Sequence, residues 1–256
     1  MSLFEQVRRL VEAGERAVVF TVIQGEPLGA KLLVGDDGEV IAGDAPRELA
    51  EQTEQLIRSG HSRVLEVDGR RVFAEVLGPP PRLLVFGAVD TAEALCAAAN
   101  AIGWTTIVAD ARAKFATADR LPSADEVIVA WPEEALARVQ PDHTTAVVVL
   151  THDDKFDIPA LTGALATDAC YIGALGSRRN QARRRERLVE AGVDEAQLDR
   201  IAGPCGLDIG ADTPAETALS ILAEILAVKA GRTGGPLREA TTRIHVEREP
   251  ETAPTP

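Results

Sequence analysis

From residue 82 onward, the chain alternates short, unbroken apolar runs with stretches of helical character. Five of these runs are RLLVFG, TTIVAD, DEVIVAW, TTAVVVLT and ACYIGALG. A run without polar alternation suits a strand that is buried on both faces, as strands are in a parallel sheet built from βα units. The pattern therefore predicts the α/β class, with a parallel sheet covered by helices on both sides.

Three consecutive prolines, Pro79 to Pro81, stand just before the first of these runs. Proline does not fit inside a helix or a central strand, so residues 79–82 are predicted to link two domains. The preceding residues 1–78 hold two helical patterns and two strand pairs, each pair joined by an Asp-Gly turn. This composition predicts a small α+β N-terminal domain.

Residues 83–230 are predicted to form the parallel-sheet domain. Its last helix carries a clear start signal, with Thr213 as N-cap, Pro214 at the first helical position and Glu216 at the third. From residue 231 to residue 256 the chain is polar and has no periodicity. We expect this segment to be a mostly disordered tail.

The charge and cysteine content exclude several classes of protein. The formal net charge is −13, and a field of that sign repels nucleic acids and anionic membranes. The three cysteines are far apart and odd in number, so neither a disulfide framework nor a metal-binding spacing is present, and a cytoplasmic location is expected. The sequence has no signal-peptide pattern and no apolar run long enough to span a membrane.

The first strand, turn and helix of the parallel-sheet domain have the layout of a Rossmann-like dinucleotide site. Gly87 ends the strand, and Asp110 follows it by 23 residues, close to the spacing of a ribose-binding acid. Val89 stands where a second glycine would be needed for close approach to a pyrophosphate. We interpret the turn as one that no longer binds a dinucleotide, and we keep an NAD(P)-dependent oxidoreductase or other nucleotide-binding protein as the alternative.

The segment THDDKFD follows a buried strand and holds His152, Asp153, Asp154 and Asp157. A histidine beside carboxylates can transfer protons, bind a metal or contact a ligand. Aspartate at such a place can equally cap the next helix, and both interpretations stay open.

In the later loop GPCGLDIGADTPAE, Thr213 is either a helix cap or a ligand contact, and Cys205 is either a buried apolar residue or a reactive thiol.

Positive charge is concentrated in the segment YIGALGSRRNQARRRERL, which has six arginines between positions 178 and 187. A strand runs through Gly176 and Ser177 into a helix that begins near Arg178. Free backbone N–H groups, a hydroxyl and the guanidiniums of Arg178 and Arg179 then converge, which predicts an anion or phosphate site. The later arginines, 183–187, are predicted to form a solvated or partner-facing surface.

Three segments together resemble the XdhC/CoxI family, the xanthine dehydrogenase accessory factors. They are THDDKFD, YIGALGSRR and GLDIGADTPAETALSILAEILA, and they stand in the family's order between Leu83 and Lys229. The resemblance implies a Rossmann-like C-terminal domain behind a small N-terminal domain. It also implies a chaperone, rather than a turnover enzyme, that binds molybdenum cofactor as molybdopterin or its nucleotide form and assists its insertion into a molybdenum hydroxylase.

The resemblance also implies partners and site residues. The partners would be the molybdenum hydroxylase apo-enzyme, a cysteine desulfurase and a second copy of the chain. The residues assigned to cofactor binding are Gly87, Asp110, His152, Asp153, Gly176, Ser177, Arg178, Arg179 and Thr213. The chain departs from the family in two places: IAGDAPRELAEQ has no Gly-Gly-Cys segment, and the first Rossmann turn reads Gly-Ala-Val-Asp instead of Gly-Ala-Gly-His. Cys205 is the candidate to replace the missing cysteine.

Overall fold

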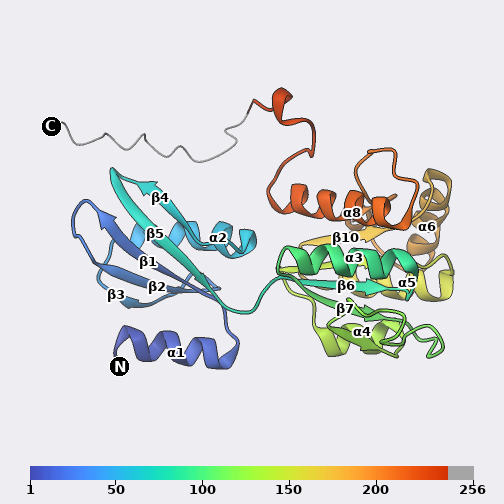
Figure 1. The fold of residues 1–256 in the computed structure, drawn as a ribbon, viewed down its shortest axis with the longest axis horizontal. Coiled ribbons are helices and arrows are strands. Elements are labelled where there is room, and N and C mark those ends of the chain that lie inside the picture. The colour runs from blue at the N-terminus through green and yellow to red at the C-terminus, as the bar shows by residue number, and fades with distance from the viewer. Residues whose placement is uncertain (242–256) are drawn as a thin grey trace.

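The computed structural model describes residues 1–241 and contains two sheets, each with its own helices (Figure 1). Part of the predicted tail, residues 242–256, lies outside the described residues. The described part of that tail contains one short 3₁₀ helix, η2 (Leu237–Glu239).

The N-terminal sheet is antiparallel and has five strands in the order β3-β2-β1-β5-β4. The strands are β1 (Ala17–Gln24), β2 (Lys31–Gly35), β3 (Val40–Gly43), β4 (Arg63–Val67) and β5 (Arg70–Leu77). Tight turns join β2 to β3 and β4 to β5, at the two Asp-Gly pairs that the sequence singled out. The structure therefore confirms both predicted strand pairs.

Helices cover both faces of this sheet. Helix α1 (Leu3–Ala13) buries Leu10 against one face, and α2 (Thr53–Ser59) buries Leu56 and Ile57 against the other. The second predicted helical pattern begins as a 3₁₀ helix, η1 (Arg47–Gln52), and continues directly as α2. Both helices are confirmed, and together with the sheet they form the small α+β unit that the sequence predicted.

The C-terminal sheet is parallel and has six strands in the order β11-β10-β9-β6-β7-β8. The strands are β6 (Arg82–Phe86), β7 (Thr105–Ala109), β8 (Glu126–Ile128), β9 (Thr145–Val149), β10 (Tyr171–Ala174) and β11 (Ile201–Ala202). All of these strands except the short β11 correspond to the five apolar runs of the sequence. The strand order reverses between β6 and β9, and in such sheets ligands bind outside the carboxyl ends of the strands at this point.

Helices lie on both faces of the parallel sheet, which confirms the Rossmann-like α/β class. On one face, α3 (Asp90–Ala101) packs beside α8 (Pro214–Lys229), over an aliphatic core that includes Leu95 and Ile221. On the other face lie α4 (Pro132–Val139), α5 (Asp154–Leu165) and α6 (Arg178–Glu190), over a core that includes Leu161 and Leu188. A short helix, α7 (Glu195–Leu198), precedes β11.

Charged side chains connect the two sheets. The Nη1 atom of Arg16, just before β1, lies 2.8 Å from Oδ2 of Asp142, which also lies 3.2 Å from Nη2 of Arg82. Nearby, Nε2 of His143 lies 3.1 Å from Oδ1 of Asp36 in the β2–β3 turn. These contacts involve the amino ends of β6 and β9. The N-terminal sheet therefore meets the parallel sheet at the edge opposite the carboxyl ends of its strands (Figure 1).

The Asp142 carboxylate is strongly stabilised in its ionised form. Partial burial alone would raise its pKa, but the hydroxyls of Thr145 and Thr144 donate to it, and the charges of Arg16 and Arg82 add to their effect. The net result is a pKa well below the usual range of an aspartate.

Within residues 1–241, none of the helices combines the length and the apolar character needed to cross a bilayer.

Candidate functional site

Most of the predicted site residues meet at the carboxyl edge of the parallel sheet. Gly87 follows β6, Asp110 follows β7, His152 and Asp153 follow β9, and the segment from Gly176 to Arg179 follows β10. Because the strands are parallel, their carboxyl ends share one edge. Thr213 differs from this group in not following a strand directly: it is the N-cap of α8, on the face of the sheet that α3 also covers.

The two glycines at this edge allow turns that no other residue would fit. Gly87 has φ +110°, and a Cβ atom there would lie 2.8 Å from the side chain of Thr151, so only glycine lets the β6 turn approach the end of β9. Gly176 has φ +144°, which turns the chain from β10 into α6. Both glycines thus have a structural reason to be present, whatever else they contact.

The predicted ribose-binding acid, Asp110, is engaged by the protein itself. Its Oδ2 accepts from the backbone N–H of Ala88 at 2.9 Å and from Nη2 of Arg112 at 2.6 Å. Its Oδ1 accepts from the backbone N–H and from Nε of Arg112, both at 2.9 Å. Four donors fill the four lone-pair positions of the carboxylate. The geometry therefore leaves Asp110 no free acceptor for a ribose hydroxyl.

The environment keeps this carboxylate ionised. Burial alone would raise the pKa of Asp110, whose side chain is only 2% exposed, but the hydrogen bonds from Arg112 and Ala88 and the guanidinium charge outweigh burial and lower it. Sequence reasoning missed Arg112. A signal for it exists, because an arginine two residues after a candidate acid can fold back onto the carboxylate.

The THDDKFD segment divides into a cap, an exposed histidine and a buried acid. Asp153 is the N-cap of α5, and its Oδ1 accepts from the backbone N–H of Lys155 at 3.0 Å, which matches the helix-cap interpretation. His152 is exposed, and no hydrogen bond or ion pair of its side chain occurs within residues 1–241. Asp157, the last acid of the segment, is the buried member.

Asp157 belongs to a buried polar network beneath the edge. Its Oδ1 accepts from the hydroxyl of Thr151, and its Oδ2 lies 2.8 Å from Nη2 of Arg184. The guanidinium of Arg184 also donates to Oε1 of Gln181 and to the carbonyl of Leu175, each at 3.0 Å. The network thereby links the end of β9 to the residue just before Gly176.

The prediction of a solvated surface over residues 183–187 is wrong for Arg184. Its side chain is 6% exposed, because it lies on the buried face of α6 with Gln181 and Leu188. The three positions are spaced i, i+3 and i+7, a helical periodicity that was available in the sequence. The other late arginines are more exposed and pair with acids: Arg183 and Arg187 with Asp154, and Arg185 with Asp199.

The two arginines at the start of α6 differ from the later four. Arg178 and Arg179 are exposed, and neither forms an ion pair with any described residue. Their backbone N–H groups also have no acceptor within residues 1–241. Ser177 is the N-cap, and its Oγ accepts from the backbone N–H of Asn180 at 3.2 Å. Free donors and uncompensated positive charge thus meet at one helix N-terminus, the combination that favours anions.

The remaining candidates have structural roles. Oγ1 of Thr213 accepts from the backbone N–H of Glu216 at 3.2 Å, and the Glu216 side chain accepts from the backbone N–H of Thr213 at 2.8 Å, so the predicted capping box is confirmed. Cys205 is buried, and burial raises the pKa of its thiol to about 12. Among residues 1–241, no three His, Cys, Asp or Glu side chains are grouped so as to hold a metal ion.

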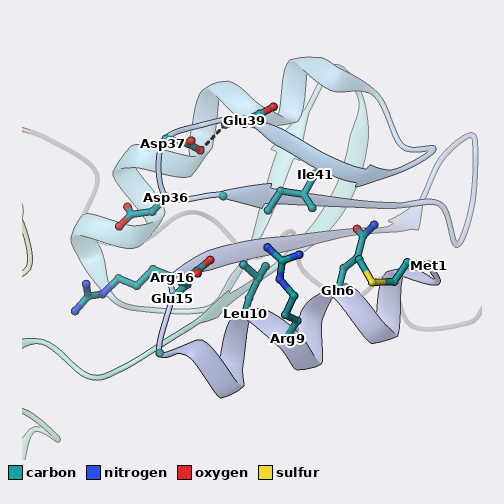
Figure 2. A pocket seen from close by; sticks show the side chains of 12 residues that line it. Met1, Gln6, Arg9, Leu10, Glu15, Arg16, Asp36, Asp37, Glu39 and Ile41 are labelled. Atoms are coloured by element: carbon teal, nitrogen blue, oxygen red, sulfur yellow. Dashed lines mark hydrogen bonds between the residues drawn. The ribbon is translucent and has the colours of Figure 1, made fainter.

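A groove of about 500 Å³ lies elsewhere, between α1 and the β2–β3 turn (Figure 2). Arg9 and Leu10 of α1 face Asp36, Asp37 and Glu39 of the turn region across it (Figure 2). The excess of carboxylates makes this groove a poor place for an anionic ligand. It also adjoins the contact between the two sheets, on the opposite side from the carboxyl edge.

Comparison with known proteins agrees with this architecture. The family model described as the XdhC Rossmann domain matches residues 83–225. A Bacillus subtilis protein named as a probable subunit of xanthine dehydrogenase is 30% identical over 223 residues, which are 87% of this chain and 64% of the relative. The Escherichia coli molybdenum cofactor insertion chaperone PaoD is 30% identical over 151 residues, 59% of this chain and 41% of the relative.

A solved structure has the same fold. A crystal structure from Bacillus halodurans, described as a xanthine dehydrogenase, superposes with a TM-score of 0.66 at 24% identity, covering 89% of this chain and 66% of that one. The chain spans less than two thirds of the length of either of the two curated relatives described above.

The fold and the carboxyl edge define a Rossmann-like α/β protein whose first nucleotide turn is closed by its own Asp110 and Arg112. Its positive charge is instead presented after β10, at Arg178 and Arg179. The chain belongs to the XdhC family, as the match over residues 83–225 shows. The resemblance noted in the sequence is thereby confirmed.

Proposed function

We propose that this protein is an accessory factor that binds molybdenum cofactor as cargo and assists its insertion into a molybdenum hydroxylase. The observation that carries the proposal is the pair Arg178 and Arg179, the only two of the six α6 arginines between residues 178 and 187 without an acidic partner among the described residues. The proposal is supported by the names of the relatives, one a cofactor insertion chaperone and another a probable xanthine dehydrogenase component.

The residues at this edge fit the anionic part of the cargo. Molybdopterin carries a phosphate group, and its nucleotide form carries a pyrophosphate. Two guanidiniums and the unpaired N–H groups at the start of α6 supply charge-assisted donors for such a group. Arg184, held by Asp157, donates to the Leu175 carbonyl and so fixes the turn that presents Ser177. The general field of a chain with net charge −13 still repels bulk polyanions.

Sulfur transfer fits this edge poorly. A sulfur carrier needs an accessible thiolate. Burial raises the pKa of Cys96 and Cys205 to about 12, and it also raises the pKa of the partly buried Cys170. The role of a cysteine desulfurase as partner therefore has no support in the described side chains, and Cys205 is a poor replacement for the missing family cysteine. We retain the apo-hydroxylase as the proposed partner.

The domain limits remain part of the proposal. Residues 1–78 and 83–230 would be two domains joined by the Pro-rich segment 79–82, with the contact at Asp142 setting their orientation. Because that contact is at the amino edge of the parallel sheet, the proposed cargo site belongs to the C-terminal domain alone.

The test is retention of molybdenum cofactor after gel filtration, with the bound compound identified by mass spectrometry. The double variant Arg178→Ala/Arg179→Ala should lose the cargo. The matched control is Arg183→Ala/Arg187→Ala, which removes the same charge from the same helix at arginines that already pair with Asp154. Equal losses from both variants would indicate a diffuse charge effect and refute the specific site. Arg184→Ala is unsuitable as a control because the side chain is buried.

A further inference from the structure

An aromatic cluster with a guanidinium lies at the same carboxyl edge, on the opposite side of the switch point from α6. Trp131 follows β8, and Phe156 lies in the first turn of α5. Their rings stack with centroids 4.9 Å apart and planes 19° from parallel. The guanidinium carbon of Arg112 lies 5.6 Å from the Phe156 ring centroid and 4.7 Å from that of Phe115.

The two tryptophans of this chain differ sharply in exposure. The protein has only two tryptophans and six phenylalanines. Trp104 is 7% exposed and part of the core, whereas Trp131 is 48% exposed although Phe156 stacks against it. Half of the Trp131 residue surface is therefore open to a ligand, beside a ring that is already stacked. The side chain of Trp131 makes no cap hydrogen bond to α4, so it is not engaged in capping.

The crevice at the switch point is too small to hold a ring. A cavity of only about 10 Å³ remains there, lined by Gly87, Asp110, Thr151 and Phe156 among others. That volume holds about one water molecule and no ring. A planar ligand at this edge must therefore lie outside Phe156, where Trp131 and Arg112 provide the surface.

Arg112 is already ordered and still has donors to offer. Its Nε and Nη2 atoms are fixed on Asp110, and its side chain is 43% exposed. Its Nη1 atom makes no hydrogen bond to any described residue. A guanidinium fixed by a carboxylate loses little further entropy when it binds a polar ring edge. The Asp110 carboxylate and, more weakly, the charge of Asp153 raise the pKa of Arg112, so the guanidinium stays protonated.

We propose that Trp131, Phe156 and Arg112 form a stacking site for a planar nitrogen heterocycle. The electron-rich faces of aromatic rings and the plane of a guanidinium both stack on such rings, and the free Nη1–H groups suit a ring carbonyl or nitrogen. A pterin and a nucleobase share this chemistry. Naming the pterin of molybdenum cofactor as one source rests on the proposed function, whereas the site itself does not.

The site lies within reach of the anion-binding turn. The order β10-β9-β6-β7-β8 places the end of β8 four strands from the end of β10, or about 19 Å at the usual strand spacing. One extended ligand with a ring at one end and a phosphate group at the other could contact both. The two sites can nevertheless be tested separately, because they share no residue.

The test uses tryptophan fluorescence. A Trp104→Phe background leaves Trp131 as the single tryptophan. This protein is titrated with pterin-6-carboxylate and, separately, with GMP and CMP. We expect saturable quenching by at least one probe, and the probe that quenches identifies the source of the ring. Absence of quenching by all three at millimolar concentration would overturn the proposal.

Binding is then measured by calorimetry in variants of the wild-type chain. Trp131→Ala should weaken the active probe about tenfold or more, since one stacked base contributes about 1–3 kcal/mol. Trp131→Phe should recover most of the affinity, and Phe156→Leu should lose part of it. Leu219→Ala, which removes a 56% exposed apolar side chain from α8, is the control and should change nothing. Equal affinities of the Trp131→Ala and control proteins would refute stacking.

Failure of this inference and failure of the proposed function give different results. If no ring binds but cofactor retention still depends on Arg178 and Arg179, the stacking site is wrong and the accessory function stands. If a ring binds to Trp131 but cofactor is not retained, the stacking site stands and the accessory function is wrong.

Discussion

Replacing Arg184 by alanine should destabilise the parallel-sheet domain strongly. The Arg184 and Asp157 side chains are 6% and 3% exposed, so the substitution leaves a buried carboxylate with only the Thr151 hydroxyl as side-chain partner. It also removes the donor to the Leu175 carbonyl and the partner of Gln181. Removing one member of a buried ion pair costs about 3–5 kcal/mol, because the other charge stays buried and uncompensated.

The matched control is Arg185→Ala, one residue further along α6. Arg185 lies 3.1 Å from Asp199, but the two side chains are 40% and 80% exposed. A pair of that kind contributes about 0–1 kcal/mol. Both variants remove one positive charge and one arginine from the same helix. The difference between their unfolding free energies therefore isolates the effect of burial.

The assay is urea unfolding followed by tryptophan fluorescence. Both tryptophans, Trp104 and Trp131, belong to the parallel-sheet region, so the signal reports on that region alone. The urea midpoint of Arg184→Ala should fall well below that of the control. A thermal melt of the same variant should show a Tm loss of about 10 °C. The double variant Arg184→Met/Asp157→Leu should recover most of the loss, because two apolar side chains leave no uncompensated charge. Equal midpoints for Arg184→Ala and Arg185→Ala would refute the reasoning.

Three further predictions concern other parts of the chain. Asp142→Asn should lower Tm between pH 5 and 8, because the Asp142 pKa is lowered in the folded protein and its stabilisation is full above the unfolded pKa of about 3.9. In a Tm series the gap to the wild type should begin to narrow below about pH 4 and shrink further as the pH falls towards the folded pKa. Thr213→Ala should cost about 1 kcal/mol in urea unfolding, whereas Thr213→Ser should cost little. Cys96 and Cys205 should react with a thiol reagent at pH 8 only after denaturant is added, because burial raises their pKa to about 12; rapid labelling of the native protein would contradict their burial.

The sequence predicts the fold well because the relevant signals are local and repeated. Nearly every strand of the parallel sheet corresponds to an unbroken apolar run in the sequence, and each predicted strand pair of the N-terminal sheet has its own Asp-Gly turn. The Thr213 capping box needs only four consecutive residues. Signals of this kind depend on backbone preferences and do not require knowledge of which elements lie next to one another.

The candidate site was less accessible because its contacts join residues far apart in sequence. Arg184 and Asp157 are 27 residues apart, and only the packing of α5 against α6 shows that they form a pair. Charge alone made Arg184 look like a surface residue, although its spacing from Gln181 and Leu188 indicates the buried face. Trp131 and Phe156 meet only because α4 and α5 are neighbours, and no local motif encodes that contact.

The four hydrogen bonds around Asp110 have a consequence for the order of this edge in the unbound protein. In a dinucleotide-binding relative of this fold, a ribose and a pyrophosphate order the first turn and the acid after the second strand. Here Arg112 takes the place of the sugar hydroxyls, and the Asp110 carboxylate occupies the Ala88 N–H that a phosphate oxygen would use. The chain thus carries an internal substitute for a ligand. This edge therefore does not need a bound nucleotide to hold its first turn in place.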